Sequence, residues 1–280
     1  MKSGTILLIG PTNSGKSTLL NKIIGKRVSL VSRKKQSTTF NQKAIKSVSE
    51  AEIILQDTPG IFSSTKRISN RMSNSAISEI ETATIIYLVL DISKKIEPTL
   101  NKIIKTLNNK VNEQRIFLVL NKIDKISRGN IILKIKDYKN QTELEDIFPI
   151  SALDGEGISD LLEFTKKYLP ERKQRYSKKK TTLLKKDLFY SEITREKIYD
   201  KIHKEIPYLC KVHTERIKKT KDEITIHQRI AISKKSHKNI LIGKRGSTLK
   251  EIGTQSRREI AKFENKKINL FLFVKLESEK

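Results

Sequence analysis

The sequence predicts an α/β protein in which a domain with a mostly parallel sheet precedes a smaller α+β domain. Three observations predict this class. The chain has 280 residues, a length that suits about two domains. Short apolar runs in the first half end in a glycine turn or a polar residue, as buried strands of a parallel sheet do. After residue 190 the pattern becomes a helix, two alternating stretches and a glycine loop between helical segments. We expect domains at 1–170 and 191–280, joined by a basic linker at 171–190.

The charge of the chain predicts a polyanionic partner. It holds 58 Lys+Arg against 31 Asp+Glu, a formal net charge of +27 and a pI near 10.0. Residues 171–280 carry 31 of these basic residues and 14 of the acidic ones, so the excess is larger in the second domain. This balance excludes a DNA-mimicking role and favours nucleic acid or an anionic membrane surface. The lysines at 178–180 are interpreted either as a solvated linker or as nucleic-acid contacts.

The cysteine count and the lengths of the apolar runs exclude several classes of protein. The single cysteine, Cys210, excludes a disulfide framework and a cysteine-only metal cluster. No apolar run reaches 18 residues, and residues 1–4 lead directly into an apolar run without a signal-peptide pattern. We therefore expect a cytoplasmic protein.

The first apolar run, 5–9, is followed by a glycine loop and then by helical spacing over 19–24. The loop matches G-x-x-x-x-G-K-[ST], whose glycines turn backbone NH groups toward phosphates at a helix N-terminus. Lys16 is predicted to reach the β- and γ-phosphates as a catalytic residue, and Ser17 to ligate Mg²⁺. The residues assigned to nucleotide binding here are Gly10, Pro11, Thr12, Asn13, Ser14, Gly15, Lys16, Ser17 and Thr18.

A second apolar run, 53–56, delivers the sequence Asp57-Thr58-Pro59-Gly60. An acid at the end of a strand beside the phosphate loop can hold Mg²⁺ through water, and the Gly60 NH can meet the γ-phosphate. We assign Asp57 to the metal, Gly60 to catalysis and all four residues to nucleotide binding.

The next two runs, 85–91 and 116–120, lead to the base-recognition residues. Asn121-Lys122-Ile123-Asp124 follows the second of them. The Asp124 carboxylate can accept from both the ring NH and the exocyclic amine of guanine, and adenine offers neither donor on that edge. Asn121 and Lys122 are predicted to support this loop and cover the base. A fifth run ends in Ser151 and Ala152, where the Ala152 NH is predicted to donate to guanine O6.

These motifs, in this order, resemble the translation-factor-like small GTPases. The resemblance implies GTP and GDP as ligands, GTP hydrolysis, and a switch threonine that binds Mg²⁺ and the γ-phosphate; we favour Thr38, with Thr39 or a plain surface loop as the alternatives. Ile61 follows Gly60 where Ras-like enzymes carry a water-orienting glutamine, so we expect slow intrinsic hydrolysis. Asn13 is interpreted either as a K⁺-holding residue, as in related GTPases, or as a turn residue.

The second domain has its own glycine signature. Gly243-Lys244-Arg245-Gly246 lies between two helical segments and follows a helix beginning near Ser191 and two extended stretches. This order is typical of a type II KH domain, whose G-x-x-G loop clamps a single-stranded nucleic-acid backbone. A helix-turn-helix corner is the alternative. We assign RNA binding to Gly243, Lys244, Arg245 and Gly246.

Taken over the whole chain, the sequence resembles the Era family of bacterial GTPases. The resemblance rests on Q-S-T-T at 36–39, S-E-I-T-R-E-K at 191–197, E-I-P-Y at 205–208 and the loop at 243–246. It implies binding near the 3′ end of 16S rRNA, a role in 16S rRNA processing and in 30S subunit biogenesis, and peripheral contact with the inner membrane in some settings. We expect a monomer. The alternative is a regulatory GTPase whose basic C-terminal domain docks on anionic lipid.

Other polar residues are not assigned to catalysis, ligand binding or a metal site. Asp91 is predicted to be a structural cap, and Cys210 a half-buried strand residue. The four histidines lack a metal-ligand spacing and are expected to make surface or partner contacts.

Overall fold

The computed structural model describes residues 1–28, 42–57, 74–96, 100–108, 114–142, 144–177, 180–202 and 209–277. The chain divides into two units, Met1–Leu183 and Leu184–Lys280, which are considered separately. The predicted α/β class is confirmed. In the described part of the chain, no helix combines the length and apolarity needed to cross a membrane.

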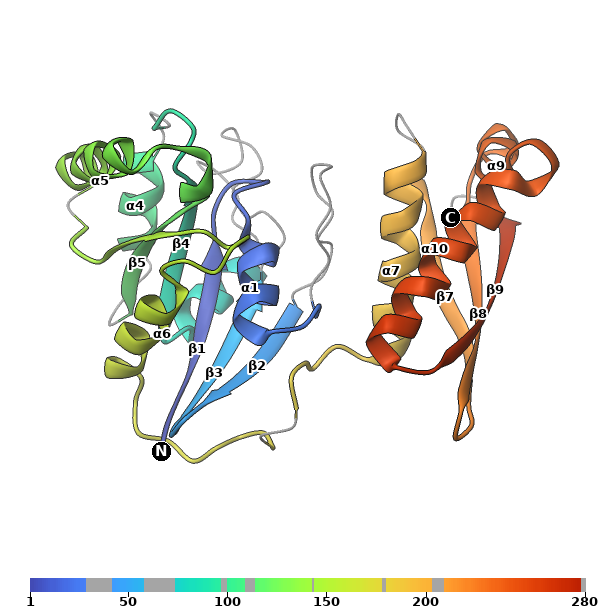
Figure 1. Ribbon diagram of the computed structural model, residues 1–280, viewed down its shortest axis with the longest axis horizontal. Helices are drawn as coiled ribbons and strands as arrows, with labels where there is room; N and C mark the ends of the chain where they lie inside the picture. The colour runs from blue at the N-terminus through green and yellow to red at the C-terminus, as the bar shows by residue number, and fades with distance from the viewer. Residues whose placement is uncertain are drawn as a thin grey trace. The chain divides into compact units, whose positions relative to one another are not determined.

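The first unit is built on a six-stranded sheet with strand order β2-β3-β1-β4-β5-β6 (Figure 1). All neighbouring strands are parallel except β2 and β3, which pair antiparallel. The strands are β1 (Lys2–Ile9), β2 (Gln42–Val48), β3 (Ala51–Asp57), β4 (Ile85–Asp91), β5 (Arg115–Asn121) and β6 (Ile147–Ile150). The four predicted strands at 5–9, 53–56, 85–91 and 116–120 lie within β1, β3, β4 and β5.

Helices cover both faces of this sheet. The helices are α1 (Lys16–Ile24), α3 (Asn74–Thr82), α4 (Leu100–Asn108), α5 (Arg128–Thr142) and α6 (Ile158–Lys167), with the 3-10 helix η1 (Ile123–Lys125). Successive residues of each central strand belong to different cores: Tyr87 packs in a cluster with residues of α1 and α6, and Leu88 in a cluster with residues of α3, α4 and α5. Burial on both faces explains why these strands are apolar without alternation.

The chain leaving α6 remains attached to the first unit. Glu52 of β3 is fully buried, and its carboxylate accepts hydrogen bonds from the Ser3 hydroxyl (2.9 Å) and from the backbone NH groups of Arg175 (3.0 Å) and Tyr176 (2.9 Å). Further along, residues 181–183 pair with the outer edge of β2: Ile45 NH donates to Thr181 O and Leu183 NH donates to Lys43 O, each at 3.0 Å. Much of the segment predicted as a linker is therefore held by backbone hydrogen bonds.

The second unit has a three-stranded sheet, β7 (Lys211–Lys219), β8 (Glu223–Ile232) and β9 (Lys267–Leu276), in that order. β7 and β8 are antiparallel, with a bulge between Thr214 and Arg216, and β8 and β9 are parallel. Its helices are α7 (Lys186–Lys201), α9 (Lys235–Ile242) and α10 (Ser247–Glu264), with the 3-10 helix η2 (Lys244–Gly246).

The core of the second unit lies between its helices and one face of its sheet. Ile198 of α7, Ile230 of β8, Leu241 of α9 and Ile252 of α10 are fully buried in one cluster. Two details of the prediction were wrong. The first helix begins at Lys186, five residues before Ser191, and Cys210 is buried just before β7 instead of half-buried within a strand, because its thiol packs into this cluster.

Candidate functional site

The phosphate-binding segment, residues 10–18, consists of the loop between β1 and α1 and the first residues of α1, and it requires glycine at two positions. Gly10 has φ 151°, and a Cβ there would lie 2.1 Å from the Val89 carbonyl oxygen. Gly15 has φ 99°, and a Cβ there would lie 2.1 Å from Nδ2 of Asn121. The loop can therefore pass close to its neighbours and present its backbone NH groups at the N-terminus of α1, where an anion is stabilised.

The side chain of Lys16 folds into this loop. Its Nζ donates to the carbonyl oxygens of Gly10 (3.0 Å) and Pro11 (2.8 Å), and the residue is only 8% exposed. Burial lowers the pKa of Lys16, while the nearby Asp57 carboxylate acts in the opposite direction. The ammonium is thus already inside the loop that would surround the phosphates. Pro11 and Thr12 are partly exposed on the same loop, and Thr18 is partly exposed in the first turn of α1.

Ser17 and Asp57 meet at the position expected for Mg²⁺. The Ser17 hydroxyl donates to Oδ2 of Asp57 at 2.6 Å, and Asp57, the last residue of β3, is fully buried. A hydroxyl and a carboxylate are the hard oxygen ligands that Mg²⁺ prefers, and Mg²⁺ usually completes its shell with water and substrate phosphates. These two residues therefore fit the ion.

Asn121, the last residue of β5, connects three loops. Its Nδ2 donates to the Ser14 carbonyl oxygen (2.8 Å), and its Oδ1 accepts from the NH groups of Lys122 (2.8 Å) and Ala152 (2.9 Å). The Ala152 NH, which was predicted to donate to guanine O6, donates to Asn121 in this structure. A buried NH needs an acceptor, and Asn121 supplies it.

The Asp124 carboxylate is exposed and oriented by one neighbour. Its Oδ1 accepts from the hydroxyl of Ser151 at 2.8 Å, and Ser151 itself is fully buried at the end of β6. A carboxylate held in this way can accept hydrogen bonds from the two NH groups that guanine presents on one edge. Ser151 therefore orients the carboxylate for which base selection was predicted.

Lys122 connects the base loop to the phosphate loop in a way that the sequence did not reveal. Its backbone is left-handed (φ 71°), and its Nζ lies 2.6 Å from both the Asn13 carbonyl oxygen and Oδ2 of Asp91. The other carboxylate oxygen of Asp91 accepts from the NH and hydroxyl of Ser93, so Asp91 both caps a turn, as predicted, and pairs with Lys122. Burial opposes ionisation of Asp91, but the hydrogen bonds from Lys122 and Ser93 outweigh it and lower its pKa.

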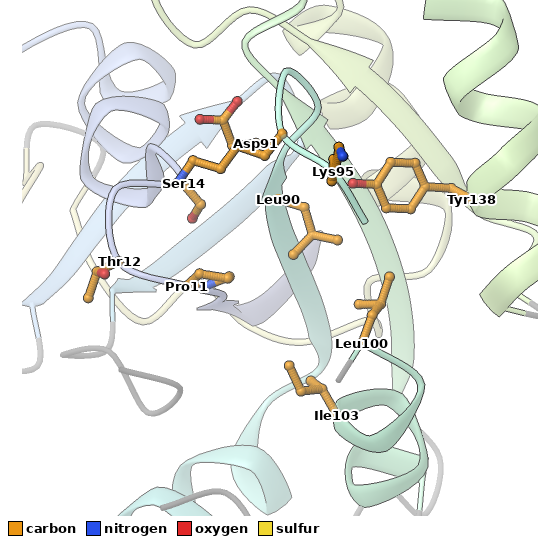
Figure 2. A pocket seen from close by; sticks show the side chains of 10 residues that line it. Pro11, Thr12, Ser14, Leu90, Asp91, Lys95, Leu100, Ile103 and Tyr138 are labelled. Carbon is orange, nitrogen blue, oxygen red and sulfur yellow. The ribbon is translucent and has the colours of Figure 1, made fainter. Parts of the chain in front are cut away.

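A pocket adjoins the phosphate loop on the side of β4 and α4 (Figure 2). Leu90, Leu100 and Ile103 supply apolar side chains to it, and Asp91 lies among its lining residues beside Ser14. Asp91 therefore borders this pocket as well as pairing with Lys122.

Several predicted residues lie outside the part of the chain that the structure describes. They are the switch residues Thr38 and Thr39 and, after Asp57, the residues Thr58, Pro59, Gly60 and Ile61.

In the second unit, the loop at 243–246 turns the chain between α9 and α10. Gly243 (φ 75°) packs so closely that a Cβ there would lie 2.2 Å from Oγ1 of Thr248, whereas a Cβ at Gly246 (φ 78°) would meet no atom within 4 Å. Lys244 and Arg245 are exposed at the tip, and Arg245 adopts φ 52°. The loop therefore combines a tight start, two solvent-facing cations and open space beside its second glycine.

Comparison with known families agrees with the division of the chain into two units. A family model described as 50S ribosome-binding GTPase matches residues 5–122, and one described as KH domain matches residues 205–280.

Curated relatives match almost the whole chain. The GTPase Era of Agrobacterium fabrum is 36% identical over 98% of this chain and 86% of its own length. The GTPase Era of Syntrophus aciditrophicus is 38% identical over 98% of this chain and 90% of its own.

Solved structures give the same result. The chain is similar to a point variant of Aquifex aeolicus Era bound to GDP.AlF4-, with a TM-score of 0.90 and 33% identity over 100% of this chain and 95% of the other. It is also similar to Era in complex with MgGDPNP and nucleotides 1506–1542 of 16S ribosomal RNA, with a TM-score of 0.89, 33% identity and the same coverage. A guanine-nucleotide and Mg²⁺ site followed by a KH domain, in a chain that matches these relatives over nearly its full length, places this protein in the Era family of GTPases.

Proposed function

We propose that this GTPase binds the 3′ end region of 16S rRNA through its second unit and assists 16S rRNA processing and 30S subunit biogenesis. The loop at 243–246 is the observation that carries the proposal. Its exposed Lys244 and Arg245 can neutralise phosphates, each contact making binding more salt-dependent. The open space beside Gly246 is where an RNA backbone can come close to the loop.

The first unit supplies the switch. Lys16 binds and orients the β- and γ-phosphates from inside the loop, and Ser17 and Asp57 would hold Mg²⁺. When bound, this ion neutralises charge on the phosphates. Asp124 selects guanine and Asn121 fixes its loop to the phosphate loop. Because isoleucine at position 61 cannot hydrogen-bond a water, we expect slow turnover by the free protein.

A bound K⁺ is a proposed accelerator of this hydrolysis. Asn13 is exposed at the tip of the phosphate loop with a left-handed backbone (φ 64°), so its side chain is available to a cation beside the phosphates. Turnover is expected to be faster in K⁺ than in Na⁺ and to lose this preference in Asn13→Gly, which tolerates the same backbone angles. Equal rates of the unmodified protein in the two salts would contradict a K⁺ site.

The RNA function is tested by crosslinking the full chain, loaded with GDPNP or with GDP, to total cellular RNA. We expect fragments from the small-subunit rRNA 3′ end to be enriched in the GDPNP state and lost in K244D/R245D. The control K136D/K139D makes the same charge change on the exposed face of α5. No enrichment of these fragments, or binding of the protein to anionic vesicles alone, would contradict the proposal and favour the membrane-docking alternative.

A further inference from the structure

The sheet of the second unit has one face that the helices of its described part do not cover. Along β8, Ile224, Ile226 and Ile230 point into the core, whereas Thr225, His227 and Arg229 alternate with them and stay partly exposed. The parallel register with β9 places His227 beside Phe271 and Arg229 beside Phe273. We call this surface the open face and define it by Arg216, His227, Arg229, Phe271, Phe273 and Lys275.

The open face presents aromatic rings to solvent. Phe271 is 53% exposed and Phe273 is 41% exposed, two positions apart on one strand. The imidazole of His227 stacks on the Phe271 ring with centroids 4.9 Å apart and an interplanar angle of 14°. Flat rings exposed at such spacing on a sheet are the platforms on which RNA-binding sheets stack unpaired bases.

Cations share this face with the rings, on β7 and further along β9. Lys211, Arg216 and Lys218 of β7 and Lys275 of β9 are exposed, and none of them forms an ion pair or side-chain hydrogen bond with another residue in the described ranges. The acidic residues near this face are already engaged: Glu215 lies 2.6 Å from Nε of Arg229, Glu277 also pairs with Arg229, and Glu223 lies 3.7 Å from Nζ of Lys267. The charge left for a partner is therefore positive.

We propose that the open face is a second RNA-binding surface, which stacks the bases of single-stranded RNA on Phe271 and Phe273 and binds its phosphates with these cations. It is separate from the loop at 243–246, because that loop joins α9 and α10 and these helices pack on the opposite face. Exposed phenylalanines among lysines also suit a lipid surface. The imidazole stacked on Phe271 favours bases, since a polar ring extends a stack of bases but would lose hydration among lipid chains.

The proposal extends the RNA binding proposed above, so its test must separate the two surfaces. The full chain carrying K244D/R245D is compared with the same chain carrying F271A in addition, using a fluorescent uridine dodecamer and fluorescence anisotropy. Loss of one stacking ring is expected to raise Kd about tenfold, and F271Y to restore binding. The control is L276A, a side chain of similar exposure (47%) on the same strand whose position alternates to the other face.

Each outcome either supports or contradicts RNA binding by the open face. Weaker dodecamer binding by F271A with unchanged binding by L276A and an unchanged thermal midpoint supports the open face. The proposal fails if F271A and L276A behave alike, if K244D/R245D alone abolishes binding of the dodecamer, or if F271A reduces only sedimentation with phosphatidylserine vesicles. If instead K244D/R245D leaves capture of small-subunit RNA unchanged while F271A reduces it, the proposal stands and the assignment of the loop fails.

Discussion

The Lys122 ammonium lies 2.6 Å from the Asp91 carboxylate and, at the same distance, from the Asn13 carbonyl oxygen. One side chain thereby holds together the end of β4, the base loop and the phosphate loop. Since the carboxylate of this pair is almost fully buried, with a 6% exposed side chain, the interaction is screened less than a surface ion pair.

Asp91→Asn is expected to weaken GDP binding about 5- to 30-fold, which corresponds to about 1–2 kcal/mol. The amide oxygen can still accept a hydrogen bond but carries no charge to balance that of Lys122, so the contact that holds Lys122 beside the phosphate loop is weakened. Dissociation of a fluorescent GDP analogue measures the effect. Glu163→Gln, which removes the partner of Lys166 in a pair whose carboxylate is 67% exposed, is the control. A Kd equal to that of the unmodified protein would show that the pair does not act on the nucleotide.

Ser17→Ala is expected to remove most of the effect of Mg²⁺ on nucleotide release. The substitution deletes one proposed ligand of the ion and the hydrogen bond to Asp57. Ser14→Ala is a matched control in the same loop, because the buried Ser14 hydroxyl has no hydrogen-bond partner among the described residues. Release rates with Mg²⁺ and with EDTA should converge in Ser17→Ala only. Convergence in both variants would point to general loosening of the loop.

Asp124→Asn is expected to exchange preference for GDP for preference for xanthosine diphosphate. Xanthine replaces the exocyclic amine of guanine with a carbonyl oxygen, which an asparagine amide can meet as a donor. Competition calorimetry with the two nucleotides measures their relative affinities for the variant. Retained preference for GDP would show that Asp124 does not face the base edge.

Glu192→Gln is expected to flatten the pH dependence of the stability of the second unit. Burial raises the pKa of Glu192 to about 7, with Arg195 opposing the shift and Glu196 adding to it. The folded unit therefore binds this proton more tightly than the unfolded chain, so the free energy of unfolding falls as pH rises from about 4.5 to about 7, by up to about 3 kcal/mol. Calorimetric melting at pH values below and above this window tests the sign.

In that experiment, Glu192→Gln should melt at nearly the same temperature on both sides of the window and be the more stable protein above it. Glu251→Gln removes a half-exposed carboxylate that pairs with Lys201 and serves as the control. Equal destabilisation of Glu192→Gln at both pH values would mean that its contact with Arg195, 3.3 Å long, outweighs the cost of burial.

Local patterns predicted much of the fold. Continuous apolar runs identify β1, β3, β4 and β5, because a strand covered on both faces has no polar side to show. β2 escaped notice because Lys43 and Lys46 interrupt its apolar residues on an outer strand. The start of α7 was placed too late, since Lys185 and Lys186 resemble the basic run before them.

The sequence predicted which residues form the nucleotide site better than it predicted which of them contact one another. Each loop of the nucleotide site has its own motif, but the pairing of Lys122 with Asp91 joins positions 31 apart that no local pattern relates. The open face was missed for a different reason. β9 reads I-N-L-F-L-F-V, apolar on both sides, so only the packing of α10 shows that its phenylalanines are the side left in solvent.

The pairing of residues 181–183 with β2 has a consequence for the first unit on its own. β2 is the outermost strand of its sheet, and an unpaired outer strand is a template for strand addition by another molecule. Residues 181–183 pair with this outer edge and so prevent another molecule from adding a strand there. A fragment ending at residue 170 would lose both this pairing and the backbone partners of Glu52, whereas one ending at Leu183 keeps them.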